Sequence, residues 1–233
     1  MQDEARALNI GFVARMSRGR PWLRMKIAAS LDGRTALANG RSQWITGPEA
    51  RRDGHAWRAR ACAVLTGIGT VRDDDPQLNV REVETPRQPL KVVVDSRLQL
   101  PLSAKLLASG KVLVAAAIDD KDAIAALQDK GAEVIVLANA RGKVELTELM
   151  RELARRELNE VHVEAGFKLN GSLLGEGLVD ELLIYLAPGI LGDSARGMFH
   201  LPELRDLAQK RLLQFADVQT IGGDLRILAR VLN

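Results

Sequence analysis

Short apolar segments alternate with amphipathic segments along most of this chain, and this alternation limits its fold more than any other feature. The apolar segments are short enough for strands and span residues 63–66, 91–95, 111–116, 133–137 and 160–163. Longer segments with helical periodicity lie between them at 48–61, 120–130 and 147–158. Strands with continuous apolar character are buried on both faces, and their alternation with helices is typical of parallel sheets. The sequence therefore predicts an α/β fold with a mostly parallel sheet flanked by helices.

The N-terminal part predicts a helix, a strand and a second helix. Residues 3–17 carry Leu8, Phe12 and Met16 at four-residue spacing, which predicts an amphipathic helix. Residues 22–30 alternate in polarity and predict a strand that leads into a turn. Thr46, followed by Pro48 and Glu49, predicts a helix start in which Thr46 is the cap.

The C-terminal part predicts a helix, a strand and a closing hairpin. Residues 166–175 predict the helix, and residues 181–186 predict the strand. Two further apolar segments, 214–220 and 225–231, flank Ile221-Gly222-Gly223-Asp224, which predicts an antiparallel hairpin with a tight turn. The polar, proline-bearing stretch 73–89 predicts an ordered loop.

Composition narrows the function classes. The 233 residues can build one sizeable domain, and the net charge of +3 is spread among alternating acids and bases, as on solvated helix faces. Aromatic residues make up only 3% of the chain, which argues against base stacking, so no nucleic-acid partner is expected. No apolar stretch approaches the roughly 18 residues that span a bilayer, so no membrane partner is expected either. Cys62 is the only cysteine, which excludes a disulfide within the chain.

Candidate binding residues follow the strands, because ligands of parallel sheets bind beyond the strands' carboxyl ends. Gly166 lies at a strand-to-helix junction, where backbone N–H groups can receive a phosphate, although an ordinary tight turn explains it equally well. The segment 67–71 can likewise be a phosphate-binding backbone or an ordinary tight turn. Lys26 in the middle of a strand and Glu164 at a strand end each need a partner.

The remaining charged groups leave their roles open. Arg58 and Arg81 can each form a planar fork onto a phosphate, or they can be solvated surface residues. The run Asp73-Asp74-Asp75 lacks His or Cys partners and EF-hand spacing, so no metal is expected. The three histidines show no ligand spacing, and the sequence contains no nucleophile elbow or P-loop.

Five motifs in a fixed order carry a family resemblance. They are residues 26–34, 42–46 with 50–53 and 58–59, 67–71 with 73–81, 94–96, and 164–166. Together they span most of the chain between residues 5 and 230, and over that range the chain resembles the reductases of riboflavin biosynthesis.

The resemblance implies an architecture. It implies a dihydrofolate reductase-like α/β fold with a twisted, mostly parallel sheet, flanking helices and a C-terminal β-hairpin, in a cytoplasmic homodimer. In that architecture residues 1–20 form a connecting helical segment, and residues 21–233 form a single reductase domain. Bacterial members of the family are typically fused to an upstream zinc deaminase with His-x-Glu and Pro-Cys-x-x-Cys motifs. The chain lacks these motifs, so we expect the deaminase to be absent here and to be present, by fusion, in the natural protein.

The resemblance also implies a reaction: NADPH-dependent reduction of 5-amino-6-(5-phosphoribosylamino)uracil at C1′ of its ribose, giving the ribitylamino product. The residues that would contact this phosphoribosylamino-pyrimidine substrate are Lys26, Ser42, Arg58, Leu78, Arg81 and Glu164. The residues that would contact NADPH are Ala28, Trp44, Thr70, Asp74, Ser96, Gly166, Phe167, Lys168, Leu169, Asn170, Gly171 and Ser172. Arg97 is a further candidate for the adenosine 2′-phosphate, and no general acid can be assigned.

Three alternatives remain open. The first is a stand-alone reductase that acts on the non-deaminated diaminopyrimidinone. The second is dihydrofolate reductase, in which Glu164 would mimic the pterin-binding carboxylate while the arginines stay unexplained. The third is a phosphosugar- or nucleotide-binding module without activity.

Overall fold

The computed structural model describes residues 8–232. The contacts between residues divide the chain into two compact units. Unit 1 holds the described chain up to Trp22 together with Arg58–Val163, and unit 2 holds Leu23–Trp57 together with the described chain from Glu164 onward. Each unit is described by itself.

The sheet of unit 1 is parallel throughout, as the alternation of strands and helices predicts. Its strand order is β7-β3-β4-β5-β6, and every adjacent pair in it is parallel. The strands are β3 (Ala63–Gly67), β4 (Leu90–Val94), β5 (Val112–Ala116), β6 (Ala132–Val136) and β7 (Glu160–Val163). The boundaries of β7 are as predicted, and the others differ from the prediction by one residue.

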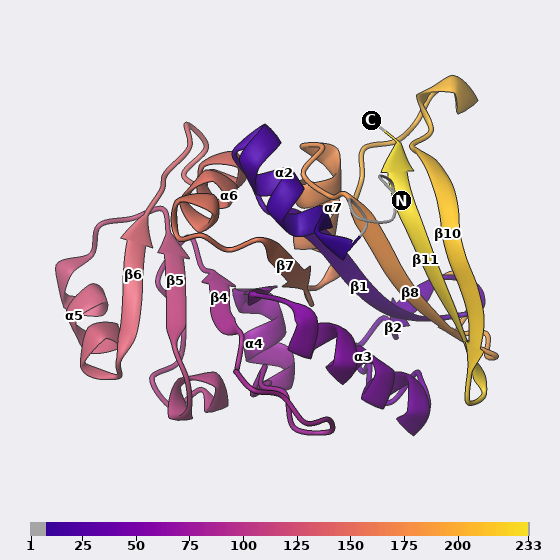
Figure 1. Ribbon diagram of the computed structural model, residues 1–233, viewed down its shortest axis with the longest axis horizontal. Coiled ribbons are helices and arrows are strands. Elements are labelled where there is room, and N and C mark those ends of the chain that lie inside the picture. The colour runs from indigo at the N-terminus through magenta and orange to yellow at the C-terminus, as the bar shows by residue number, and fades with distance from the viewer. Residues whose placement is uncertain (1–7, 233) are drawn as a thin grey trace. The chain divides into compact units, whose positions relative to one another are not determined.

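Helices and short turns cover this sheet. They are α2 (Ile10–Arg18), α4 (Ile68–Asp74), the 3-10 turn η1 (Lys105–Ala108), α5 (Lys121–Asp129) and α6 (Leu146–Arg155). Figure 1 shows α5 beside β6, with which it makes contact. An aliphatic core forms where Val71 of α4 and Leu127 of α5 pack with Val93 and Val114 of the strands.

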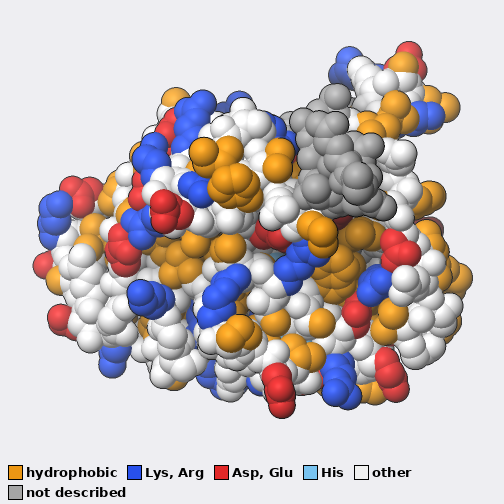
Figure 2. Space-filling model, viewed as in Figure 1, with side chains coloured by type: hydrophobic (Ala, Val, Ile, Leu, Met, Phe, Trp, Pro, Cys, Tyr) orange, Lys and Arg blue, Asp and Glu red, His pale blue; other side chains and the backbone are white. Residues whose placement is uncertain are grey.

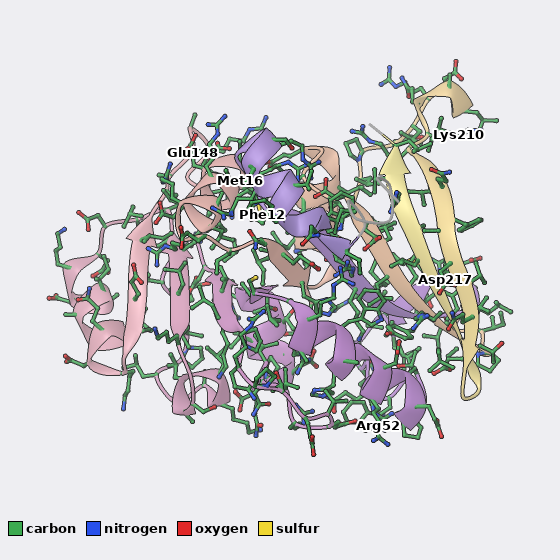
Figure 3. All side chains as sticks on the ribbon, viewed as in Figure 1. Phe12, Met16, Arg52, Glu148, Lys210 and Asp217 are labelled. Carbon is green, nitrogen blue, oxygen red and sulfur yellow. The ribbon has the colours of Figure 1, made fainter. Side chains whose placement is uncertain are left out.

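The N-terminal helix buries a different face from the one that its sequence pattern suggests. The helix predicted over residues 3–17 is α2, and residues 3–7 lie outside the described residues. The apolar residues Leu8, Phe12 and Met16 are exposed, with 80%, 49% and 65% of their surface accessible. Figure 2 shows hydrophobic side chains gathered over α2, and Figure 3 labels Phe12 and Met16 there. The buried residues of the helix are Gly11 and Ala14. The chain packs so closely at Gly11 that a Cβ there would lie 2.7 Å from the Asn159 carbonyl oxygen.

The segment that follows β3 is helical rather than a simple turn. Residues Ile68–Asp74 form α4, so the predicted loop over 73–89 begins only at Asp75, which ends the helix in a left-handed conformation (φ 41°). The glycine-rich start hid this helix from the sequence analysis. Its register is fixed by Val71, which is buried in the core of unit 1.

Unit 2 has a mixed sheet that ends in the predicted hairpin. Its strand order is β10-β11-β8-β1. β1 and β8 are parallel, whereas β11 runs antiparallel to both β8 and β10. The strands are β1 (Trp22–Ser30), β8 (Glu181–Ala187), β10 (Leu212–Ile221) and β11 (Asp224–Leu232). Gly222, with φ 60°, lies in the hairpin turn, where this conformation favours glycine.

Smaller elements complete unit 2. β2 (Arg34–Ala36) and β9 (Arg196–Gly197) form a two-stranded ribbon, and Leu207–Gln209 form the 3-10 turn η2. The sequence analysis predicted none of these three. The helix α7 (Phe167–Gly175) follows Gly166 as predicted.

The helix α3 (Pro48–Arg60) packs on the sheet of unit 2 with its first three turns. Ala50 of α3 forms a buried cluster with Leu183 and Tyr185 of β8. The predicted cap is wrong by one position: the Gly47 carbonyl accepts the first helical hydrogen bond, from Arg51 N at 3.2 Å, so Gly47 occupies the cap position instead of Thr46. The Gly47 N–H donates to Asp224 Oδ2 at 2.7 Å.

Candidate functional site

The predicted pyrimidine-binding residues of unit 2 lie around Tyr185. Lys26 is half-buried in β1, and its Nζ lies 5.9 Å from the centroid of the Tyr185 ring on β8. Its Cε is also 4.0 Å from the point where a Cβ would sit on Gly54 of α3. Glu164, the residue after β7, is near enough for its charge to help raise the pKa of Tyr185. Lys26 therefore contacts the Tyr185 ring, and the charge of Glu164 acts on the same tyrosine.

An ion-pair network fixes the phenol of Tyr185. Its hydroxyl donates to Asp53 Oδ2 at 2.5 Å. Asp53 is ion-paired with Arg226 at 3.2 Å, and Arg226 also pairs with Asp217 at 2.8 Å. Burial, followed by the bond to Asp53, raises the pKa of Tyr185 far above its usual range. The phenol therefore stays protonated and serves as a fixed hydrogen-bond donor. No single sequence pattern indicates this network, because its members come from α3, β8, β10 and β11.

The loop before α3 presents two predicted residues of unit 2, and β1 presents a third. Ser42 is half-buried, and Trp44 is exposed with 69% of its surface accessible. The Arg51 guanidinium lies 4.6 Å from the Trp44 ring centroid, a cation–π contact that holds the indole at the surface. Ala28 of β1 is half-buried and is paired in register with Tyr185.

The N-terminus of α7 has the geometry expected of an anion-binding helix start. Gly166 is extended (φ −76°, ψ 164°), and no side chain caps the first turn, where Gly166 and Lys168 are exposed. Backbone N–H groups of such a turn can bind a phosphate.

The second turn of α7 is packed instead. Asn170 and Gly171 are buried, and Asn170 Nδ2 donates to the Met198 carbonyl oxygen at 3.4 Å. The Ser172 hydroxyl donates to the Lys168 carbonyl oxygen, and Phe167 and Leu169 are half-buried.

In unit 1 the two predicted phosphate-binding arginines meet at one residue. Arg58, which is 9% exposed, donates from Nη1 to the Asn79 carbonyl oxygen at 2.5 Å. Arg81 donates from Nη1 to Asn79 Oδ1 at 3.4 Å. Leu78, next to Asn79, is 2% exposed and has a φ of 53°. The structure therefore brings Arg58, Leu78 and Arg81 together around the start of the loop.

The predicted NADPH contacts of unit 1 fall into two groups. Thr70 and Asp74 lie four residues apart on α4, which places them on one face of that helix. Ser96 lines a cavity of about 280 Å³ at the end of β4, together with Arg97 and Lys143. Two cations beside a hydroxyl suit a phosphate group, so this cavity fits the cofactor that the family resemblance implies. Lys143 was not predicted as a site residue, because it is far from Ser96 in the chain.

Two features of the described residues bear on other functions. No group of three His, Cys, Asp or Glu side chains in the described range is placed to hold a metal ion. Among the helices of residues 8–232, none combines the length and apolar character needed to cross a membrane.

Comparisons with known proteins identify close relatives. The family model for the RibD C-terminal domain matches residues 21–227. Riboflavin biosynthesis protein RibD of Haemophilus influenzae is 41% identical over 97% of the chain, and that of Escherichia coli is 39% identical over 97%. The chain covers 63% and 64% of the length of these two relatives.

A crystal form of Acinetobacter baumannii RibD superposes with a TM-score of 0.87 at 38% identity, covering 99% of this chain and 63% of that one. The yeast riboflavin biosynthesis reductase Rib7, from Saccharomyces cerevisiae, has a TM-score of 0.69 at 18% identity. It covers 98% of this chain and 100% of its own, and it agrees in fold.

Proposed function

The chain belongs to the RibD C-terminal domain family, and from that membership we propose that it is an oxidoreductase of riboflavin biosynthesis. Its proposed reaction is the NADPH-dependent conversion of 5-amino-6-(5-phosphoribosylamino)uracil to 5-amino-6-(5-phosphoribitylamino)uracil. The observation that carries this assignment is the meeting of Arg58 and Arg81 at Asn79, because two guanidinium groups at one residue suit the phosphate of a sugar phosphate.

Unit 1 supplies the phosphate-binding groups in this proposal. Arg58 is preorganised, because its short bond to the Asn79 carbonyl oxygen leaves few positions for the guanidinium. A guanidinium group is a multiple N–H donor that suits phosphate oxygens, and Arg58 and the more exposed Arg81 each carry one. Leu78, next to Asn79, backs the sugar.

Unit 2 supplies the groups that recognise the pyrimidine. The Lys26 ammonium donates to ring carbonyl oxygens, and the Glu164 carboxylate accepts from ring N–H or amino groups. Tyr185 keeps Lys26 in place through its ring, and the bond from its hydroxyl to Asp53 keeps the ring itself in place. These contacts orient the substrate for reduction.

NADPH, when bound, supplies the hydride that reduces C1′ of the ribose. The chain's own part is to hold the cofactor. In unit 1, Thr70, Asp74 and Ser96 contribute contacts. In unit 2, Ala28, Trp44 and the uncapped start of α7 contribute others, the last by donating backbone N–H groups to the pyrophosphate.

We also propose that the chain forms a homodimer through β10. This strand lies at the edge of the sheet of unit 2, and unpaired edge strands favour pairing with another chain. Leu213, Phe215 and Val218 of β10 are exposed, with 42%, 69% and 51% of their surface accessible. The bulge between Phe215 and Asp217 shifts the register by one residue, which keeps Val218 on the same face as the other two. Size-exclusion chromatography with light scattering should give a dimer that Phe215→Glu dissociates, and a monomeric wild type would refute the proposal.

The kinetics of an arginine variant test the proposed reaction. Arg58→Ala should lower kcat/KM for the phosphoribosylamino-uracil by about 10- to 100-fold, because it removes charge-assisted hydrogen bonds worth about 1.5–3 kcal/mol. Arg52→Ala is the matched control, because Arg52 is exposed on the same helix and is labelled in Figure 3. Equal rates for wild type, Arg58→Ala and Arg52→Ala would refute the phosphate assignment.

A further inference from the structure

The cavity at the end of β4 is built by two segments that are distant in sequence. Residues 95–97 and Gln99 form one wall, and a hairpin that includes Lys143 forms another. The hairpin is held by a bridge between Ala138 and Val144 and by the Val144 N–H, which donates to Ser96 Oγ at 3.1 Å. Ser96 therefore attaches the hairpin to the strand end and keeps its own hydroxyl hydrogen available to a ligand.

The backbone of Lys143 is fixed at the rim of this cavity. The Asn139 side chain accepts hydrogen bonds from the N–H groups of Arg141 at 2.9 Å and Lys143 at 3.0 Å. Asn139 N in turn donates to the Lys143 carbonyl oxygen at 2.8 Å. The hairpin is thus rigid at the residue that carries the ammonium group, and only the lysine side chain itself remains to be ordered by a ligand.

The cavity carries an excess of positive charge. Arg97 and Lys143 are both exposed, and within residues 8–232 neither side chain has an acidic partner. The one carboxylate in the lining, Asp95, is fully buried and accepts hydrogen bonds from the N–H groups of Leu100 at 2.7 Å and Arg97 at 3.4 Å. Burial also raises the pKa of Asp95, which weakens any repulsion of an anion.

The opposite part of the lining is apolar. Ile68, the first residue of α4, and Val94, the last residue of β4, contribute to it. A volume of about 280 Å³ suits part of a nucleotide rather than a whole dinucleotide. The cavity therefore fits a sugar or base with a phosphate monoester attached, and such a monoester carries nearly two negative charges at neutral pH.

We propose that Lys143, with Arg97, binds the adenosine 2′-phosphate of NADPH in this cavity, and that Lys143 determines the preference for NADPH over NADH. The inference rests on the proposed reductase function and adds to it a specificity residue from the 137–145 hairpin. Lys143 supplies a point charge, Arg97 supplies a planar fork, and the Ser96 hydroxyl donates the third hydrogen bond.

The first test measures binding without turnover. Calorimetry would compare adenosine 2′,5′-bisphosphate with adenosine 5′-monophosphate on the wild-type chain, Lys143→Ala and Lys143→Arg. Lys143→Ala should weaken the bisphosphate about tenfold, because one charge-assisted hydrogen bond is lost, and should leave the monophosphate unchanged. Lys143→Arg should retain most of the affinity. Arg141→Ala is the matched control, because it removes an exposed charge from the same hairpin outside the lining.

The second test measures cofactor choice with the substrate present. The ratio of kcat/KM for NADPH to that for NADH should fall about tenfold in Lys143→Ala and further in the Arg97→Ala/Lys143→Ala double variant. If Lys143→Ala is active but leaves both the NADPH-to-NADH ratio and the bisphosphate affinity unchanged, the role of Lys143 is refuted. The proposed reductase function would still stand. A wild-type chain that neither binds nor oxidises NADPH would overturn the proposed function as well.

Discussion

Replacing Gly171 of α7 by alanine should destabilise the protein more than any other glycine-to-alanine change in that helix. A Cβ at Gly171 would lie 2.0 Å from the carbonyl oxygen of His200, and 2.7 Å and 2.9 Å from the carbonyl carbon and nitrogen of the same residue. All three are backbone atoms, so no side-chain rotation can relieve the clash. The helix and the segment around His200 must separate by about 1.5 Å to reach an ordinary van der Waals distance.

The cost can be worked out from the contacts at this point. Separation breaks the bond from the His200 N–H to the Phe167 carbonyl oxygen, now 2.9 Å, which contributes about 1 kcal/mol. Overpacking adds about 1–3 kcal/mol, and the better helix propensity of alanine returns up to about 1 kcal/mol. The expected loss is about 1–4 kcal/mol, or about 2–16 °C in Tm for a chain of this size.

Gly175, in the same helix, provides the control. No heavy atom lies within 4 Å of the point where its Cβ would sit. Gly175→Ala should therefore leave Tm unchanged or raise it by about 1–3 °C. Thermal unfolding followed by circular dichroism compares the two variants directly. If Gly171→Ala melts at or above the temperature of Gly175→Ala, the packing of residues 198–200 against α7 is wrong.

Three other changes test the surroundings of the candidate site. The pKa of Asp32 is lowered to about 2, first by the Ser30 hydroxyl and then by backbone N–H groups. The ionised carboxylate therefore stabilises the fold fully above about pH 4, and this stabilisation is lost as the pH falls through about 2. Asp32→Asn should flatten the dependence of Tm on pH in that window. Arg24→Met should cost about 3–5 kcal/mol in urea unfolding because it leaves Glu181 buried without its 2.6 Å partner, and an additional Glu181→Leu should recover much of the loss. Tyr185→Phe should cost about 1–2 kcal/mol and raise KM for the pyrimidine more than it lowers kcat, whereas an unchanged KM would contradict the positioning role.

The elements that the sequence predicts well are those whose local pattern agrees with their burial. Strand β1 has the predicted boundaries because polar and apolar residues alternate along it, and the hairpin is found because Gly222-Gly223 allows its turn. The helix α4 was missed, because glycine next to Ile68 favours a turn locally and only tertiary packing of Val71 makes the segment helical. The exposed apolar stripe of α2 shows the converse, since its periodicity does not reveal which face is buried.

The residues of the candidate site also differ in whether they can be predicted from the sequence. Arg58 and Arg81 could be proposed from residue type and family resemblance, and the structure adds that Asn79 joins them. Lys143 could not be proposed, because its place beside Ser96 depends on a hydrogen bond between residues 48 positions apart. Residue type alone also gives no sign that Tyr185 lies under Lys26.

The most direct test of the central claim is substrate-dependent NADPH oxidation by the unaltered chain. Three substrates would be compared under the same conditions: the deaminated phosphoribosylamino-uracil, its non-deaminated diaminopyrimidinone counterpart, and dihydrofolate. We expect turnover with the deaminated compound, with the ribitylamino product identified by mass spectrometry. Turnover only with the diaminopyrimidinone would identify the chain as a reductase of the non-deaminated substrate instead. Turnover only with dihydrofolate, or with none of the three, would contradict the account.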